Sequence, residues 1–206
     1  MSHEPTIYIA HGFNVRDPRQ FFELASFFEA EGFPVVKVDY GWTGPVRVRF
    51  VTIKEARRLA KSVRPGDVGI GHSNGCAVLA RATELGAPFE RLIFLNPALR
   101  RSYVPETQTL KQVNVLHASD DKAVVAGKWL RRLSPLRLVQ RETMWGEMGR
   151  TGYTGSDPRV QNFLLNGMFD DEDGVGHGGA YRWDRLNTTG HLMLELATRP
   201  LAFGGE

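Results

Sequence analysis

Residues 67–85 read DVGIGHSNGCAVLARATEL, in which a short apolar run is followed by a glycine-flanked serine and then by a helical pattern. We expect a strand over Asp67–Gly71 and a helix over Cys76–Leu85. Ser73 then lies at the turn between them, with a glycine two residues to either side. Such a tight strand-to-helix turn is typical of a nucleophilic serine, because the following helix directs free N–H groups at the negative charge that develops during the reaction.

Short apolar runs alternate with helical patterns along the chain on both sides of this turn. The expected strands are Thr6–Ala10, Pro34–Asp39, Asp67–Gly71, Arg91–Leu95, Val113–His117 and Leu136–Gln140, with a further strand-like run at Arg159–Leu165. The expected helices are Pro18–Gly32, Thr52–Val63, Cys76–Leu85, about Val124–Leu133 and about Thr188–Ala197. Alternation of this kind predicts the α/β class, with a mainly parallel central sheet flanked by helices.

The length of 206 residues favours a single domain over residues 1–206. Residues 144–179 depart from the alternating pattern, because they are rich in glycine and irregular. Long irregular segments in compact domains are either functional or disordered. Since this one also carries Trp145, Tyr153 and Phe163, we expect a packed functional insertion.

Cysteine and histidine usage limits the chemistry. Cys76 is the single cysteine, which excludes an internal disulfide and a multi-cysteine metal site. The six histidines lack the spacings of metallohydrolases, so we expect no metal and no cofactor. No apolar run reaches the length of a membrane span, and the first residues lack the features of a signal peptide, so we expect a cytoplasmic protein.

The formal net charge of +3 is too small to indicate a nucleic-acid partner, and none is expected. The most basic stretch runs from Arg47 to Arg64, and within it the expected helix Thr52–Val63 places its cations opposite its apolar side chains. We interpret this as a solvated surface face. The alternative is an electrostatic docking surface for an anionic partner.

A second loop carries groups that suit the same reaction. The sequence His11-Gly12-Phe13-Asn14 follows the first expected strand. Gly12 lets the loop turn back, so that the backbone N–H groups of Phe13 and Asn74 point at one carbonyl oxygen and form an oxyanion hole. We expect His11 to brace this loop rather than to act as a base.

An activated serine needs a base and an orienting carboxylate. Asp120 and Asp121 follow the expected strand Val113–His117, at the end where open α/β sheets present catalytic groups. We favour Asp121 as the acid, because the chain returns to an apolar helix start directly after it, and Asp120 is the alternative. For the base, His177 in a glycine-rich loop is favoured over His191, which lies inside the last expected helix.

This order of an HG loop, G-H-S-x-G, an aspartate after a strand and then a histidine resembles the α/β-hydrolase superfamily, from Thr6 to about Ala180. The HGFN loop is similar to that of lipase- and esterase-like members. The resemblance implies an α/β-hydrolase fold with a minimal cap, since the chain is short. It also implies Ser73 as nucleophile, Asp121 as acid, His177 as base, and Phe13 and Asn74 as oxyanion donors.

The expected function is therefore that of a serine hydrolase that cleaves carboxylic esters through an acyl-enzyme. Its substrate would be a small-molecule or lipid-like ester, contacted by aromatic side chains drawn from Trp42, Trp145 and Tyr153, with Phe13 beside them. The alternative is a catalytically inactive binding or scaffold protein that keeps the α/β-hydrolase fold and docks through the basic helix.

Overall fold

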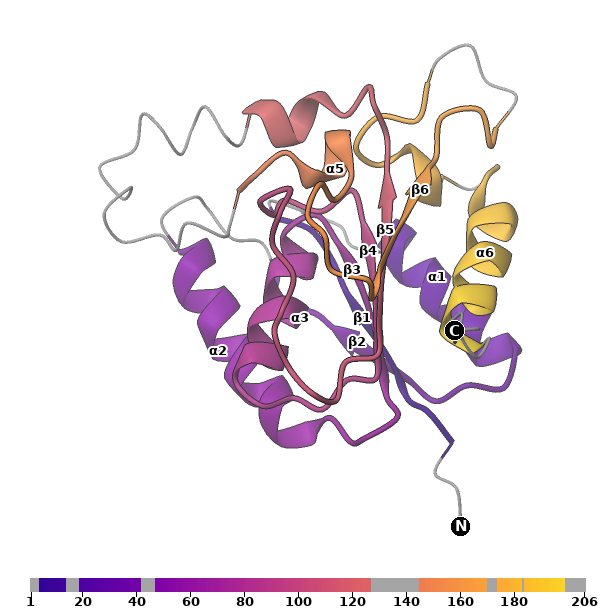
Figure 1. The fold of residues 1–206 in the computed structure, drawn as a ribbon. Helices are drawn as coiled ribbons and strands as arrows, with labels where there is room; N and C mark the ends of the chain where they lie inside the picture. The colour runs from indigo at the N-terminus through magenta and orange to yellow at the C-terminus, as the bar shows by residue number, and fades with distance from the viewer. Residues whose placement is uncertain are drawn as a thin grey trace, which may run out of the picture.

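A computed structural model describes residues 4–13, 19–41, 47–126, 145–169, 174–182 and 184–198 (Figure 1). Its centre is a six-stranded sheet with the order β2-β1-β3-β4-β5-β6, in which every pair of neighbours is parallel. The strands are β1 (Ile7–Ala10), β2 (Val35–Val38), β3 (Val68–His72), β4 (Arg91–Leu95), β5 (Gln112–His117) and β6 (Val160–Leu164).

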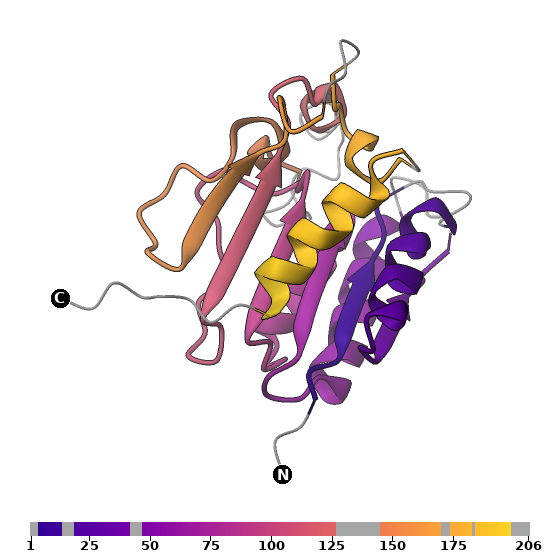
Figure 2. The ribbon, with the colours of Figure 1, turned by 90° about the vertical axis from the view of Figure 1, so that its right-hand side faces the viewer.

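Helices cover both faces of this sheet. They are α1 (Arg19–Ala30), α2 (Val48–Ser62), α3 (Asn74–Glu84), α5 (Met148–Thr151) and α6 (Leu186–Thr198), with a 3₁₀ turn, η2, at Gly179–Tyr181. Figures 1 and 2 show α2 and α3 on one face and α1 and α6 on the other. The predicted α/β class, with a parallel sheet between two helical layers, is confirmed.

Strand β1 shows why the strands of this sheet are apolar at successive residues and not only at alternate ones. Its side chains alternate, so that Ile7 and Ile9 pack in the layer of α1 and α6, whereas Tyr8 and Ala10 pack in the layer of α2 and α3. Because helices cover both faces, both sets of side chains must be apolar.

Most predicted elements overlap the observed ones closely, and the largest shift is at the start of α2. This helix begins at Val48, four residues before the predicted Thr52, because Val48 is buried and its carbonyl accepts a hydrogen bond of 2.7 Å from the Thr52 hydroxyl. Of the predicted helix at about Val124–Leu133, the described part is helical to residue 126. Its remainder and the predicted strand Leu136–Gln140 lie outside the described residues.

The described part of the glycine-rich segment packs tightly beneath the carboxyl end of β4. The Trp145 N–H donates to the carbonyl of Ala98 over 2.7 Å, and the Gly149 N–H donates to the carbonyl of Pro97 over 2.8 Å. A Cβ on Gly149 would lie 2.7 Å from the Asn96 carbonyl carbon, so glycine permits this close approach.

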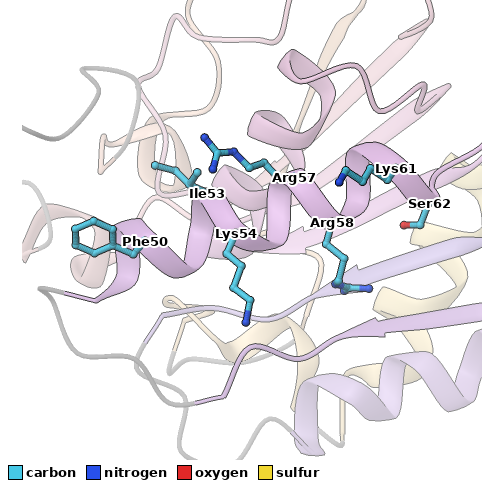
Figure 3. A pocket seen from close by; sticks show the side chains of 7 residues that line it. All are labelled: Phe50, Ile53, Lys54, Arg57, Arg58, Lys61 and Ser62. Atoms are coloured by element: carbon cyan, nitrogen blue, oxygen red, sulfur yellow. The ribbon is translucent and has the colours of Figure 1, made fainter.

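The outer side of α2 carries the predicted basic face. An open hollow there is lined by Phe50, Ile53, Lys54, Arg57, Arg58, Lys61 and Ser62 (Figure 3). Arg58 donates to Glu55 over 2.7 Å, and Phe50 is 67 % exposed. Within the described ranges, no helix combines the length and the apolar character needed to cross a membrane.

Candidate active site

The candidate residues gather at one edge of the sheet, where parallel strands end. Phe13 follows β1, Ser73 follows β3 and Asp121 follows β5. His177 follows β6 in the chain and returns to the same edge, where it contacts Asp121. This is the edge at which open α/β sheets bind ligands, because the loops after neighbouring strands meet there.

Ser73 occupies a strained turn between β3 and α3, with φ 53° and ψ −115°. A Cβ on Gly71 would lie 2.7 Å from the Cys76 backbone nitrogen, and one on Gly75 would overlap the Ala10 carbonyl oxygen. Both glycines are therefore required for α3 to approach β1 and β3 so closely. Backbone strain of this kind persists only where the surrounding structure enforces it, and it is concentrated at functional sites.

Asp121 and His177 form a hydrogen-bonded pair in which the carboxylate is buried and the imidazole is partly exposed. The Nδ1–H of His177 donates to Oδ2 of Asp121 over 2.8 Å, and the Asp121 side chain is fully buried. Burial alone would raise the pKa of the Asp121 carboxyl. Hydrogen bonds from His177, Asn96 and the Val124 N–H outweigh that effect and hold this pKa below its usual value. In a neutral imidazole with its proton on Nδ1, Nε2 is the nitrogen that can accept a proton.

The two alternatives considered for the acid and the base make other contacts. The Asp120 carboxylate accepts hydrogen bonds from the Gly176 N–H, over 2.9 Å, and from the Asn166 side chain, over 3.0 Å. His191 lies exposed on α6, with its ring edge-on to Phe27 at 5.1 Å between centroids. The geometry thus pairs His177 with Asp121.

A cavity of about 220 Å³ lies beside Ser73 and is lined by Phe13, Ser73, Asn74, Ala98, Ala123, Val124, Trp145 and His177. The rings of Phe13 and Trp145 contact each other at 5.3 Å between centroids. The two residues expected as oxyanion donors therefore line the same cavity as the serine and the histidine. Asn74 is the first residue of α3, so its N–H has no carbonyl acceptor one turn earlier in the helix.

Of the three aromatic residues expected to contact substrate, the structure brings Trp145 to this cavity. Tyr153 lies elsewhere, because its ring packs against the core on the α2 and α3 side and its hydroxyl accepts from the Asp157 N–H over 3.2 Å. Tyr153 is thus not among the described residues that line this cavity. Trp42 lies outside the described residues.

No protein-family model and no curated protein sequence matches the chain. Solved structures do match over most of its length. Alpha/beta hydrolase domain-containing protein 10 from mouse aligns with a TM-score of 0.58 at 10% identity, over 95% of this chain and 90% of that one. A carboxylesterase from Bacillus subtilis aligns with a TM-score of 0.57 at 10% identity, over 98% and 86%. The chain has the α/β-hydrolase fold.

A third match is a dienelactone hydrolase-like promiscuous phosphotriesterase from metagenomic libraries, with a TM-score of 0.53 at 17% identity, over 94% of this chain and 85% of that one. The predicted resemblance to the α/β-hydrolase superfamily is thus confirmed at the level of the fold.

Within this α/β-hydrolase fold, His11 braces the loop that carries Phe13. Its Nδ1 donates to the Gly12 carbonyl over 2.8 Å, and its Nε2 accepts from the Tyr40 N–H over 3.3 Å. The His11 ring is stacked on Tyr40 at 4.0 Å between centroids, and the Tyr40 hydroxyl donates to the His11 carbonyl. Burial lowers the pKa of His11 despite the opposing effect of the Asp39 carboxylate, which lies 3.2 Å from Nε2.

Two buried residues of the site were missed in the sequence. Asn96, which follows β4 with φ 45°, donates to Asp121 Oδ2 over 3.0 Å. The feature of the sequence that could have indicated Asn96 is its position, because it is a polar residue at the carboxyl end of the strand next to β5. His72, inside the G-H-S-x-G motif, donates from Nε2 to the His177 carbonyl over 2.8 Å. The motif allows any residue at that position, so the sequence carried no signal for it.

Complete burial, followed by the charge of the neighbouring His177, lowers the pKa of His72 to about 3. The unfolded chain therefore binds a proton at this residue below pH about 6.5, whereas the folded protein does not until near pH 3. Stability linked to His72 is fully present above pH about 6.5 and is lost as the pH falls towards 3. We expect the His72→Gln variant to lack this dependence.

Urea unfolding of both proteins at pH 7 and pH 4 measures the difference. Relative to His72→Gln, the wild type should lose about 3 kcal/mol of unfolding free energy between the two pH values. Parallel losses in the two proteins would show that His72 is not held neutral by the fold.

Proposed function

We propose that the protein is a serine hydrolase that cleaves carboxylic esters. The observation that carries the proposal is that Ser73, on its strained turn, lines one cavity together with His177, whose ring is hydrogen-bonded to the buried Asp121. Structural neighbours that are named as hydrolases support the same class of reaction.

In this reaction Ser73 Oγ attacks the ester carbonyl while His177 Nε2 takes the hydroxyl proton. Asp121 keeps the proton of His177 on Nδ1 and stabilises the imidazolium that forms. The carbonyl electron pair moves onto oxygen, where the N–H groups of Phe13 and Asn74 stabilise it. Collapse of this intermediate releases the alcohol, which takes the proton from Nε2, and water then hydrolyses the acyl-enzyme by the same steps.

The cavity favours a neutral and apolar acyl group. Its described lining is supplied mainly by Phe13, Ala98, Ala123, Val124 and Trp145, and the polar groups beside Ser73 are the ones assigned to the reaction. Hydrophobic lining with a few polar groups at the reacting end is the usual composition of small-molecule sites. We therefore propose esters of short neutral acids as substrates, with no cofactor taking part.

Hydrolysis of p-nitrophenyl acetate and p-nitrophenyl butyrate by the purified protein tests this proposal. We expect saturable turnover of both, with an initial burst of p-nitrophenol if deacylation is the slower step. A folded protein that shows no turnover above the rate in buffer would favour the alternative, an inactive binding protein with this fold.

Replacing Trp145 with Ala should change the preference for acyl length, because this side chain closes one side of the cavity. We expect the kcat/KM ratio of octanoate to acetate ester to rise by about tenfold, since pocket contacts of this size are worth 1–3 kcal/mol. Tyr153→Phe, which alters an aromatic residue away from the cavity, is the matched control and should leave the ratio unchanged. Equal changes of the ratio in both variants would show that Trp145 does not form part of the acyl pocket.

A further inference from the structure

We propose that His72 is a positioning residue that, together with Asn96 and Asp120, holds the loop of His177 in the geometry required for catalysis. The inference rests on the proposed function for its kinetic consequence, and on the contacts of residues 174–178 for its structural content.

The loop that carries His177 is rich in glycine, and it is anchored by the buried Val175 side chain and by a hydrogen bond from the Gly179 N–H to the Val175 carbonyl over 2.9 Å. It reads GVGHGG over residues 174–179, and Gly174 and Gly176 adopt positive φ angles of 73° and 58°. Glycine loses more conformational freedom on folding than any other residue, so a segment with four glycines is ordered only at a high entropic cost. Contacts with neighbouring elements must therefore fix the position of His177.

Arg185 donates to the carbonyls of Gly174 and Gly179 at the two ends of the loop. Closer to His177, the ends of three adjacent strands supply one contact each. The Asp120 carboxylate, after β5, accepts from the Gly176 N–H over 2.9 Å. The Asn96 amide, after β4, donates to the Gly176 carbonyl over 3.1 Å. The His72 ring, at the end of β3, donates from Nε2 to the His177 carbonyl over 2.8 Å. The contacts from Asn96 and His72 therefore fix the peptide groups on the two sides of the His177 α-carbon.

The contact from His72 acts on His177 itself. The His72 ring is enclosed by the rings of His177 and Tyr181, each at 4.8 Å, and by Phe21 at 5.7 Å between centroids. On its other side, a Cβ on Gly12 would lie 2.9 Å from Nδ1 of His72. One buried ring therefore contacts both the loop proposed to bind the oxyanion and the loop proposed to carry the base. Because a carbonyl can only accept, Nε2 of His72 must carry the proton.

The contact from Asn96 connects the acid to the same loop. Its side-chain nitrogen donates to Asp121 Oδ2 over 3.0 Å as well as to the Gly176 carbonyl. The carboxylate and the loop of the histidine are therefore held by one amide group, and the 2.8 Å hydrogen bond between Asp121 and His177 depends on contacts outside the pair.

The test compares His72→Leu, which removes the donor, with His72→Gln, which restores an N–H at a similar distance from the backbone. The first readout is the ¹H NMR signal of the His177 Nδ1 proton in protein labelled with ¹⁵N-histidine, which reports the hydrogen bond to Asp121 without any substrate. We expect this proton to be protected from water in the wild type, to exchange rapidly in His72→Leu, and to recover its protection in His72→Gln.

The second readout is kcat per active site, with sites counted by fluorophosphonate titration. His72→Leu should lower kcat by about 10²-fold, the cost of a misplacement near 1 Å, while KM stays unchanged. His72→Gln should recover most of this loss.

Asp120→Ala, a substitution at a partly exposed residue, provides a second variant if His72→Leu does not fold. Ser119→Ala, which alters a neighbour that binds Asn166 instead of this loop, is its matched control.

The proposal would be overturned if His72→Leu and Asp120→Ala both keep a protected proton and an unchanged kcat per active site. The role of these residues would then be in folding alone. A wild type that binds no fluorophosphonate, but loses proton protection in His72→Leu, would refute the proposed esterase while supporting the positioning of His177. An unprotected proton in the wild type would overturn the positioning claim directly.

Discussion

Replacement of Ser73 by Ala is expected to lower kcat for p-nitrophenyl butyrate by about 10⁴- to 10⁶-fold, the range found when a nucleophile that acts in a unit with its base is removed. Alanine keeps the Cβ and the backbone preferences of the turn at φ 53°, so the loss comes from the missing hydroxyl rather than from an altered fold. The measurement is the initial rate at saturating substrate, corrected for the rate in buffer.

Ser62→Ala serves as the matched control, because Ser62 is an exposed serine at the far end of α2. It should retain the wild-type kcat and KM. If Ser73→Ala keeps more than about a tenth of the wild-type kcat, a loss of less than 1.4 kcal/mol in transition-state stabilisation, Ser73 is not the nucleophile.

The second large effect concerns stability. Replacing Gly75 with Ala should lower the free energy of unfolding by about 4 kcal/mol or more, a size reserved for severe steric conflicts. The added Cβ would overlap the Ala10 carbonyl oxygen and lie 2.6 Å from that of His11. These are backbone atoms of β1 and of the loop after it, so relief requires α3 to move away from the sheet. Urea unfolding monitored by circular dichroism measures the change.

Gly86→Ala separates this conflict from the general cost of replacing a glycine. Gly86 has φ +100° but open space around its α-carbon, so we expect a loss of about 1–2 kcal/mol from backbone strain alone. Equal losses in the two variants would mean that the approach of α3 to β1 is looser than the structure indicates.

The sequence allowed the sheet and its direction to be predicted because the signals are local. Strands are short apolar runs, as at Ile7–Ala10, and a helix between strands has one apolar face, as at Arg19–Ala30. Ser73 could be singled out for the same reason, since the two glycines that its turn requires lie two residues away. The apolar helix start that follows Asp121 and the glycines around His177 favour these two residues, and their side chains are hydrogen-bonded in the structure.

The remaining features depend on contacts between distant parts of the chain. His72 and the carbonyl it binds are 105 residues apart, and Asn96 and Gly176 are 80 apart, so no local pattern joins them. Tyr153 shows that a local pattern can also suggest a contact that the fold does not make. An aromatic residue in a glycine-rich loop suggests a binding site, but its direction is set by Asn162 and Asp157, which hold it towards the core.

The central claim is that Ser73 is an activated nucleophile, and covalent labelling tests it most directly. The folded protein is treated with a fluorophosphonate at neutral pH, and the modified peptide is identified by mass spectrometry, with Ser73→Ala in parallel. We predict a single phosphonyl group on Ser73 in the wild type and none in the variant, because only a serine deprotonated by its base reacts at an appreciable rate. Modification of another residue, or none in the folded wild type, would contradict the claim.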